Sequence, residues 1–175
     1  MPNSTDYRAS QNTLIAGPTQ TVDTNPFSSM ALSPDHKDLI IVIRLTECFG
    51  THFQQLLLNG STTLTDYDTI YRQHLYTGSV TSLVQNAPLV GLAYSSTLGS
   101  SGRIEILDYA APGPKSANFW WGWGGSGNHA IENTRGVIGW IGPAITAVHP
   151  SVRDSATAIG TEQNVSGTIL CYYRS

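Results

Sequence analysis

The run Leu39-Ile40-Ile41-Val42-Ile43-Arg44-Leu45 is the strongest secondary-structure signal in the chain. Four consecutive β-branched residues stand in its middle, and such residues favour extended backbone. Because the run is almost continuously apolar, it predicts a strand that is buried on both faces or lies at the centre of a sheet. The chain is therefore expected to build a sheet around this segment.

The rest of the chain shows patterns of the same kind. No long window carries an apolar stripe at helical spacing, and short β-rich runs alternate with clusters of Gly, Pro, Ser and Asn. Alternation is clear in residues 103–109, where Ile104 and Ile106 are expected to point inward. These runs predict roughly nine strands, at residues 39–45, 53–58, 70–76, 89–94, 103–109, 118–123, 136–141, 144–149 and 166–173.

So many short strands predict an all-β fold, a jelly-roll β-sandwich. The chain has 175 residues, 40% of them hydrophobic, which suits one domain with its own core. Residues 38–175 are expected to form this domain. Residues 1–37 are expected to form an extended N-terminal arm, because residues 1–26 are polar and rich in turn formers. The first residues lack the apolar segment of a secretory signal, so none is expected.

Charge and composition argue against several classes of partner. Nine Lys and Arg against twelve Asp and Glu leave no surplus to neutralise phosphates, so no nucleic-acid partner is expected. No run of 18 apolar residues exists, so no membrane insertion is expected. Cys48 and Cys171 lie in apolar runs and are expected to be buried thiols. The five histidines are scattered without metal-ligand spacing, so no metal or other cofactor is expected.

No pattern of residues predicts an enzyme. The run Gly124-Gly125-Ser126-Gly127-Asn128 departs from the nucleophile elbow G-x-S-x-G, because Asn128 stands in place of the last glycine. Carboxylates are sparse, and nothing fixes a pair such as Asp66 and Asp68 across a cleft, as a glycosidase requires. A non-enzymatic protein is therefore expected.

Three of the four tryptophans fall within Phe119-Trp120-Trp121-Gly122-Trp123. On a strand, Trp121 and Trp123 share the face of Phe119, whereas Trp120 points the other way. The first face is expected to be core, which leaves Trp120 exposed. An exposed tryptophan either anchors a protein interface or stacks on a sugar ring. The candidate ligand or interface residues are Trp120, Trp121, Trp123, Tyr109 and Asn128.

A characteristic order of features runs from residue 38 to residue 174. The strand 39–45 is followed by a second strand that ends in Asn59-Gly60, and then by Tyr67. The later features are Ile104-Glu105-Ile106-Leu107-Asp108-Tyr109, Lys115 before the aromatic run, Ala144-Ile145-Thr146, and a last strand that follows Ser166-Gly167 and closes in Tyr-Tyr. This order resembles a domain of tailed-bacteriophage virion proteins that is similar to concanavalin-like and galectin-like jelly rolls.

The resemblance implies a structural virion protein on the exposed surface of the phage particle. The first hypothesis is a protein that decorates or cements the capsid exterior, with the major capsid protein or other virion proteins as partners. The alternative is a tail- or fibre-associated module that recognises host surface glycan, and a carbohydrate-active enzyme is a third hypothesis. The chain lacks the long repetitive or coiled-coil shaft of the fibre version, which weakens the fibre alternative. Its last strand closes in Cys171-Tyr172-Tyr173-Arg174, which also differs from the usual close of the fibre version. The resemblance also implies a homo-oligomer, taken here as a trimer.

Overall fold

The structure is a computed structural model that describes residues 13–47, 52–74, 80–93, 99–124, 131–154 and 162–174. These residues form strands and one short 3-10 helix, η1 (Leu64–Asp66), and none of the described segments is a helix long and apolar enough to cross a membrane. The strands are β1 (Leu14–Asn25), β2 (Met30–Ala31), β3 (Asp38–Glu47), β4 (His52–Leu58), β5 (Tyr67–His74), β6 (Val80–Gln85), β7 (Leu89–Ala93), β8 (Ser100–Ile106), β9 (Lys115–Gly124), β10 (Ile131–Trp140), β11 (Ala147–Arg153) and β12 (Val165–Arg174).

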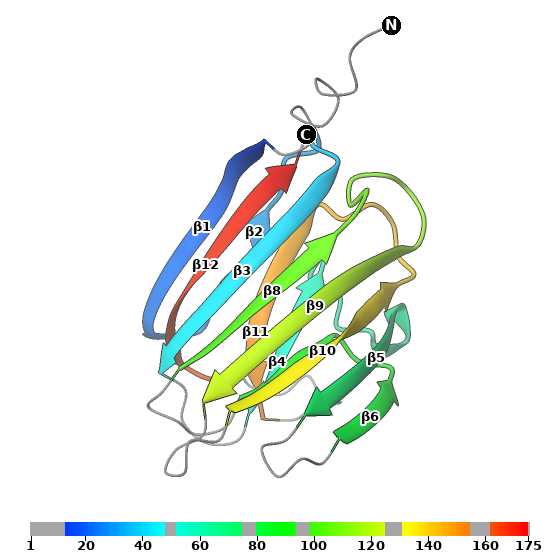
Figure 1. Cartoon of the computed structure of the whole chain (residues 1–175). Helices are drawn as coiled ribbons and strands as arrows, with labels where there is room; N and C mark the ends of the chain where they lie inside the picture. Colours follow the sequence, from blue (N-terminus) through cyan, green and yellow to red (C-terminus); the bar gives the residue numbers. More distant parts are fainter. Residues whose placement is uncertain are drawn as a thin grey trace, which may run out of the picture.

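The strands form two antiparallel sheets packed face to face as a β-sandwich (Figure 1). The larger sheet has eight strands in the order β1-β12-β3-β8-β9-β10-β5-β6, and the smaller has four in the order β2-β11-β4-β7. The all-β class predicted from the sequence is therefore confirmed.

Strand β3 holds the central position that its apolar sequence predicted. It pairs with β12 on one side and with β8 on the other. Leu39, Ile41 and Ile43 are buried in the core between the sheets, whereas Arg44 is exposed on the outer face. The early part of the strand is buried on both faces, because Ile40 is also covered. The β-branched run thus supplies the middle of the large sheet.

The segment before β3 differs from the expected arm. Residues 13–37 belong to the sandwich: β1 pairs with β12, and Phe27, Met30 and Leu32 lie in the core. A polar sequence can form β1 because this strand lies at the sheet edge, where backbone pairing needs few apolar side chains. Residues 1–12 lie outside the described residues.

A corner between the two sheets fixes how β4 leads into β5. Asn59 and Gly60 both have positive φ, 52° and 67°, at the turn that their sequence predicted. The Asn59 carboxamide accepts the N–H groups of Thr146 (2.7 Å) and Ala147 (3.2 Å) and so ties the turn to β11. The buried Tyr67 hydroxyl accepts the Leu58 N–H (3.0 Å) and donates to the Ser61 carbonyl (3.0 Å). These bonds hold the larger sheet against the smaller one.

Candidate binding face

Strand β9 separates two consecutive tryptophans onto opposite faces of the large sheet. Trp121 is 2% exposed and lies in the core, whereas Trp120 is 47% exposed on the outer face, as the alternation predicted. The Trp121 ring lies on the backbone of Gly102 in β8, where a Cβ atom would come within 1.8 Å of the indole Cε3. Glycine at this position therefore makes room for the Trp121 ring in the core.

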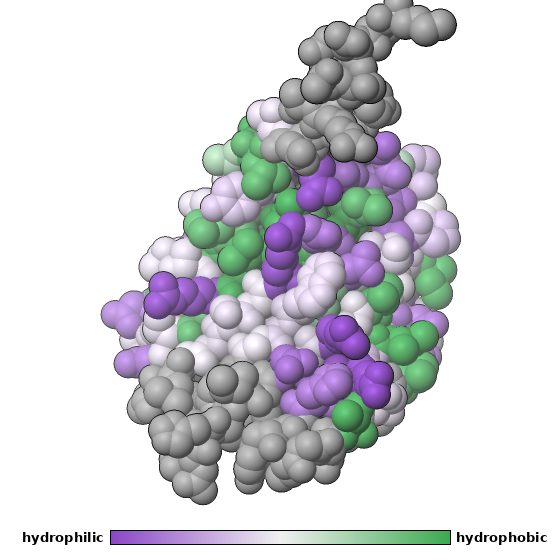
Figure 2. Space-filling view, viewed as in Figure 1, coloured by the Kyte–Doolittle hydropathy of each residue, from purple (hydrophilic) through white to green (hydrophobic). Residues whose placement is uncertain are grey.

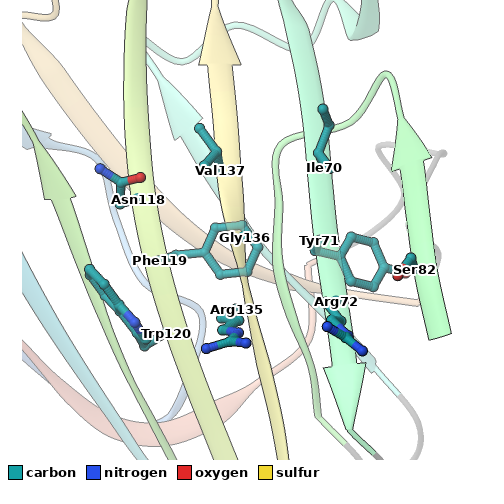
Figure 3. A pocket seen from close by; sticks show the side chains of 10 residues that line it. All are labelled: Ile70, Tyr71, Arg72, Ser82, Asn118, Phe119, Trp120, Arg135, Gly136 and Val137. Atoms are coloured by element: carbon teal, nitrogen blue, oxygen red, sulfur yellow. The ribbon is translucent and has the colours of Figure 1, made fainter. Parts of the chain in front are cut away.

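Arginines flank Trp120 along one line of cross-strand neighbours. Arg103 of β8 and Arg135 of β10 are its direct partners in the register, and Arg72 of β5 is the direct partner of Arg135. We call Arg103, Arg135 and Arg72 the arginine row. In Figure 3, Arg135 and Arg72 lie side by side at the level of Trp120. Antiparallel pairing thus brings three cations around one exposed indole.

A second line of neighbours on the same face is apolar. Val137 of β10, Ile70 of β5 and Val84 of β6 are successive cross-strand partners, with exposures of 37%, 56% and 67%. We call them the aliphatic row. Asn118 of β9 continues this line beside Val137 (Figure 3). The outer face of β8, β9, β10, β5 and β6, named here the binding face, therefore combines cationic and apolar lines next to a tryptophan.

Figure 2 shows the outer side of the large sheet, in the same view as Figure 1. Hydrophilic residues lie between apolar patches, and the surface changes character over short distances.

The surface is hollowed on both sides of Trp120. A hollow of about 450 Å³ opens toward β5 and β6, and its lining includes Arg72, Arg135, Asn118, Ser82, Ile70 and Val137. A second hollow, of about 560 Å³, opens toward β8 and β3, and its lining includes Arg103, Arg135, Asn133, Ser101 and Val42. The indole forms a wall shared by both hollows, and each holds one carboxamide and at least one guanidinium group.

The arginines of the binding face differ in whether an acidic side chain forms an ion pair with them. The Arg103 guanidinium forms an ion pair with Glu105, which Arg174 also approaches at 3.7 Å. Arg135 and Arg72 form no ion pair with another described residue. Asp68 lies on the same face of β5, but four residues from Arg72, which is about 13 Å along a strand. No acidic side chain in the described part of the chain therefore pairs with the two arginines that line the hollow toward β5.

Two of the residues singled out from the sequence lie in the core. Trp121 is buried as described above, and Tyr109 is fully buried. The Tyr109 hydroxyl donates to the Ser33 carbonyl, its ring stacks on Tyr173 at 6.0 Å, and burial raises its pKa to about 12. Tyr109 thus fixes the chain before β3 to the sandwich and does not reach the binding face. The Trp123 side chain and Asn128 lie outside the described residues.

The surface position of Trp120 followed from sequence, but its surroundings did not. In the strand predicted at residues 70–76, side-chain alternation puts Ile70 and Arg72 on one face. No sequence signal aligned them with Arg135, because register between distant strands depends on the whole fold. The arginine row, the aliphatic row, Asn118 and Asn133 are the residues that sequence reasoning missed.

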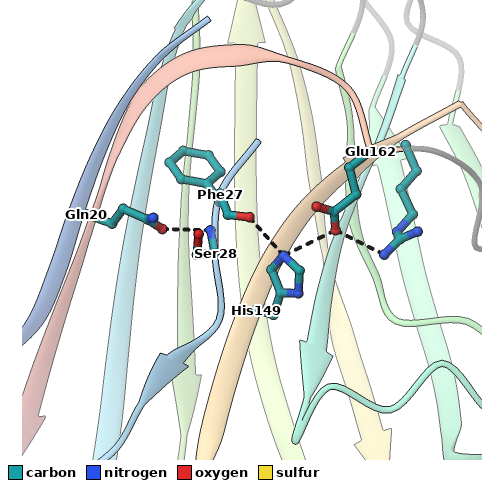
Figure 4. A network of polar contacts seen from close by, with 6 residues as sticks. Gln20, Phe27, Ser28, His149 and Glu162 are labelled. Atoms are coloured by element: carbon teal, nitrogen blue, oxygen red, sulfur yellow. Dashed lines mark hydrogen bonds and ion pairs between the residues drawn. The ribbon is translucent and has the colours of Figure 1, made fainter. Parts of the chain in front are cut away.

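A second polar network lies at the smaller sheet (Figure 4). The His149 Nε2 atom lies 3.0 Å from the Phe27 carbonyl oxygen and 3.2 Å from a Glu162 carboxylate oxygen. The same carboxylate is 3.1 Å from the nearly buried Arg153 guanidinium. The Ser28 N–H donates to the Gln20 carboxamide at 3.0 Å. These contacts fasten Phe27 and Glu162 to β11 and Ser28 to β1, which is a structural role.

The described residues contain no cluster of three or more His, Cys, Asp or Glu side chains that could hold a metal ion. Cys171 is buried, and burial raises the pKa of its thiol to about 12. A thiol of this kind stays protonated at neutral pH and is a poor nucleophile.

Comparison with known proteins gives no match: no protein-family model fits the chain, and no curated protein or solved structure is significantly similar to it. What points to a function of this chain is therefore its binding face, together with the resemblance seen in its sequence.

Proposed function

We propose that this chain is a non-enzymatic structural protein of a tailed-phage virion, which attaches to other virion proteins through its binding face. The observation that carries the proposal is the exposed Trp120 between the arginine row and the aliphatic row. Tryptophan and arginine are the residues most enriched at energetic centres of protein interfaces. The aliphatic row adds apolar area that an interface would remove from water.

The sandwich is compatible with the finer part of the proposal, a jelly-roll domain. Successive strands cross between the sheets several times, for example from β3 to β4 and from β4 to β5, and jelly rolls are likewise built of two sheets joined by such crossings. By the resemblance, the proposed location is the exterior of the particle and the proposed partner is the major capsid protein or another virion protein. The proposed assembly is a homotrimer.

The test is the amount of protein bound to purified particles, measured by gel densitometry. Trp120→Ala is expected to weaken the contact by about 2–4 kcal/mol and to reduce the copies per particle. The matched control is Ile141→Ala, which truncates an exposed apolar side chain beyond the end of β10. Equal occupancy for both variants and the unchanged protein would exclude an anchoring role for Trp120.

A second candidate function is recognition of host surface glycan. The observation that favours it is the pair of carboxamides, Asn118 and Asn133, in the two hollows that share the Trp120 indole. An indole stacks on the apolar face of a sugar ring, while amides and guanidinium groups bond its hydroxyls. Trp120→Ala on a glycan array tests this function. Lost glycan binding with normal occupancy on particles would place glycan recognition first.

A further inference from the structure

We infer that the hollow between Trp120 and β5 binds an acidic saccharide. The carboxylate of the saccharide would lie between Arg135 and Arg72, and one of its rings would stack on Trp120. This inference rests on the glycan-recognition form of the proposed function and names the chemical class of the ligand.

The two arginines are placed for one shared anion. Arg135 and Arg72 are direct cross-strand neighbours on the outer face, and their side chains run side by side (Figure 3). Cβ atoms of such a pair are about 5 Å apart, so both guanidinium groups can converge on one carboxylate. Arginine keeps its charge at every relevant pH and matches the two oxygens of a carboxylate with parallel N–H groups.

The positive charge of this hollow is also left without an acidic partner among the described residues. Like charges directly opposite on neighbouring strands destabilise a sheet, and neither arginine has an acidic partner among the described residues. The whole chain is acidic, with a net charge of −3, so this local positive charge is contrary to the general composition. A bound carboxylate would remove the repulsion between the two guanidinium groups.

The rest of the lining suits an acidic saccharide better than it suits other kinds of anionic ligand. Asn118 and Ser82 offer neutral hydrogen-bonding groups for hydroxyls, and Val137 and Ile70 offer apolar contact for a ring face. The volume of about 450 Å³ lies within the range of small-ligand sites. A single-stranded nucleic acid needs a cationic groove that follows its backbone, whereas here an aliphatic row borders the arginines.

The experiment measures binding by Trp fluorescence and calorimetry with matched pairs of saccharides. The acidic members are 3′-sialyllactose, digalacturonate and cellobiouronate, and the neutral members are lactose, galactobiose and cellobiose. At least one acidic member is expected to bind about tenfold or more tightly than its neutral counterpart, since hydrogen bonds to a charged group are the stronger ones. Added salt is expected to weaken the acidic complex and to leave the neutral one nearly unchanged.

Variants assign the effect to the two arginines. Arg135→Gln and Arg72→Gln are each expected to weaken acidic binding about ten- to hundredfold. The matched control is Arg44→Gln, which removes an exposed arginine from the same side of the sheet but outside both hollows. Its acidic binding is expected to equal that of the unchanged protein.

Several results would overturn the inference. They are equal affinity for acidic and neutral members, no binding of any acidic member, arginine variants that behave like Arg44→Gln, and binding only of polyglutamate or an oligonucleotide. Trp120-dependent binding of neutral sugars would reject the acidic class while keeping glycan recognition. A Trp120-dependent occupancy on particles, with no saccharide bound, would reject the inference and keep virion attachment.

Discussion

The two faces of the large sheet at β9 carry the same type of residue in two different environments. On the inner face, Trp121 packs against Gly102 and is almost completely buried. On the outer face, Trp120 stands between two arginines and is nearly half exposed. The two residues are consecutive in the chain and identical in type, so the contrast comes from position alone.

The contrast separates residues kept for the fold from residues available for recognition. Trp121 packs on the backbone of Gly102 inside the core, and close packing is what a core needs for a single ordered state. The neighbours of Trp120 are not explained in this way, because directly opposed arginines weaken a sheet. The outer face therefore holds groups that stability alone does not account for, and substitutions on the two faces should differ in kind.

The largest difference in stability between the two faces is expected when a charged side chain is introduced on the inner or on the outer face of β10. Ile138 is fully buried, whereas its neighbour Val137 belongs to the exposed aliphatic row. Ile138→Asp buries an unpaired carboxylate, which costs several kcal/mol and should prevent soluble expression. Val137→Asp should remain soluble and unfold cooperatively in urea. Failure of both variants to fold would show that the outer face is also structurally constrained.

A smaller difference is expected on β8, where Gly102 faces inward and Ser101 faces outward. Gly102→Ala forces a methyl group into the Trp121 ring and should lower the free energy of unfolding by about 1–3 kcal/mol. Ser101→Ala should change it by less than about 0.5 kcal/mol. Urea unfolding followed by near-UV circular dichroism checks both values. If Gly102→Ala leaves the free energy of unfolding unchanged, the Trp121 ring does not pack against the backbone of Gly102.

A buried tyrosine, Tyr67, and a tyrosine on the outer face, Tyr172, allow the two faces to be compared as a function of pH. Burial raises the pKa of Tyr67 from 10.0 to about 12, so folding favours its neutral form. The stability from this group is complete below pH 10 and is lost as pH rises through 12. Tyr67→Phe removes the bonds to Leu58 and Ser61 and should cost about 1–2 kcal/mol at neutral pH.

The difference in free energy of unfolding between Tyr67→Phe and the unchanged protein should narrow as pH rises from 10 to 12, because only the unchanged protein has the Tyr67 phenol, whose ionisation destabilises the fold. Urea unfolding at several pH values measures the gap. Tyr172→Phe is the matched control, since Tyr172 lies on the outer side of β12. Its free energy of unfolding should stay within about 0.5 kcal/mol of the unchanged protein. A gap that stays constant through pH 12 would contradict the role given to Tyr67.

The sequence allowed prediction of those strands whose burial leaves a pattern. Strand β3 is buried on both faces in its early part and therefore has an unbroken apolar run, whereas β8 and β9 bury alternate residues, so that apolar residues recur at period two. The short or edge strands β1, β2 and β6 were not expected. An edge strand is held by pairing on one side, and its exposed side chains need no alternation. For this reason the polar residues before Pro26 resembled an arm.

The candidate site could be predicted only in part, for a related reason. Alternation within one strand identified Trp120 as exposed, because that is a local property. The partnership of Arg135 with Arg72 depends on which strands are neighbours and in what register, which no local pattern encodes. Tyr109 was expected at the site, but β8 ends at Ile106 and a turn with positive φ at Asp108 leads Tyr109 into the core.

The smallest expected effect on stability has the opposite sign from the others. If Arg72 and Arg135 are kept for a ligand, their mutual repulsion is a cost that the free protein bears, so Arg72→Gln should raise the free energy of unfolding by about 0.2–1 kcal/mol. The gain should shrink at high salt, where repulsion between exposed charges is screened. Arg44→Gln should give no gain, because the cross-strand partners of Arg44 are the uncharged Ser101 and Thr168. Urea unfolding at 20 mM and 500 mM salt compares the two variants. A loss of stability in Arg72→Gln, or an equal gain in Arg44→Gln, would mean that the arginine pair supports the fold and that the contrast between the two faces is weaker than proposed.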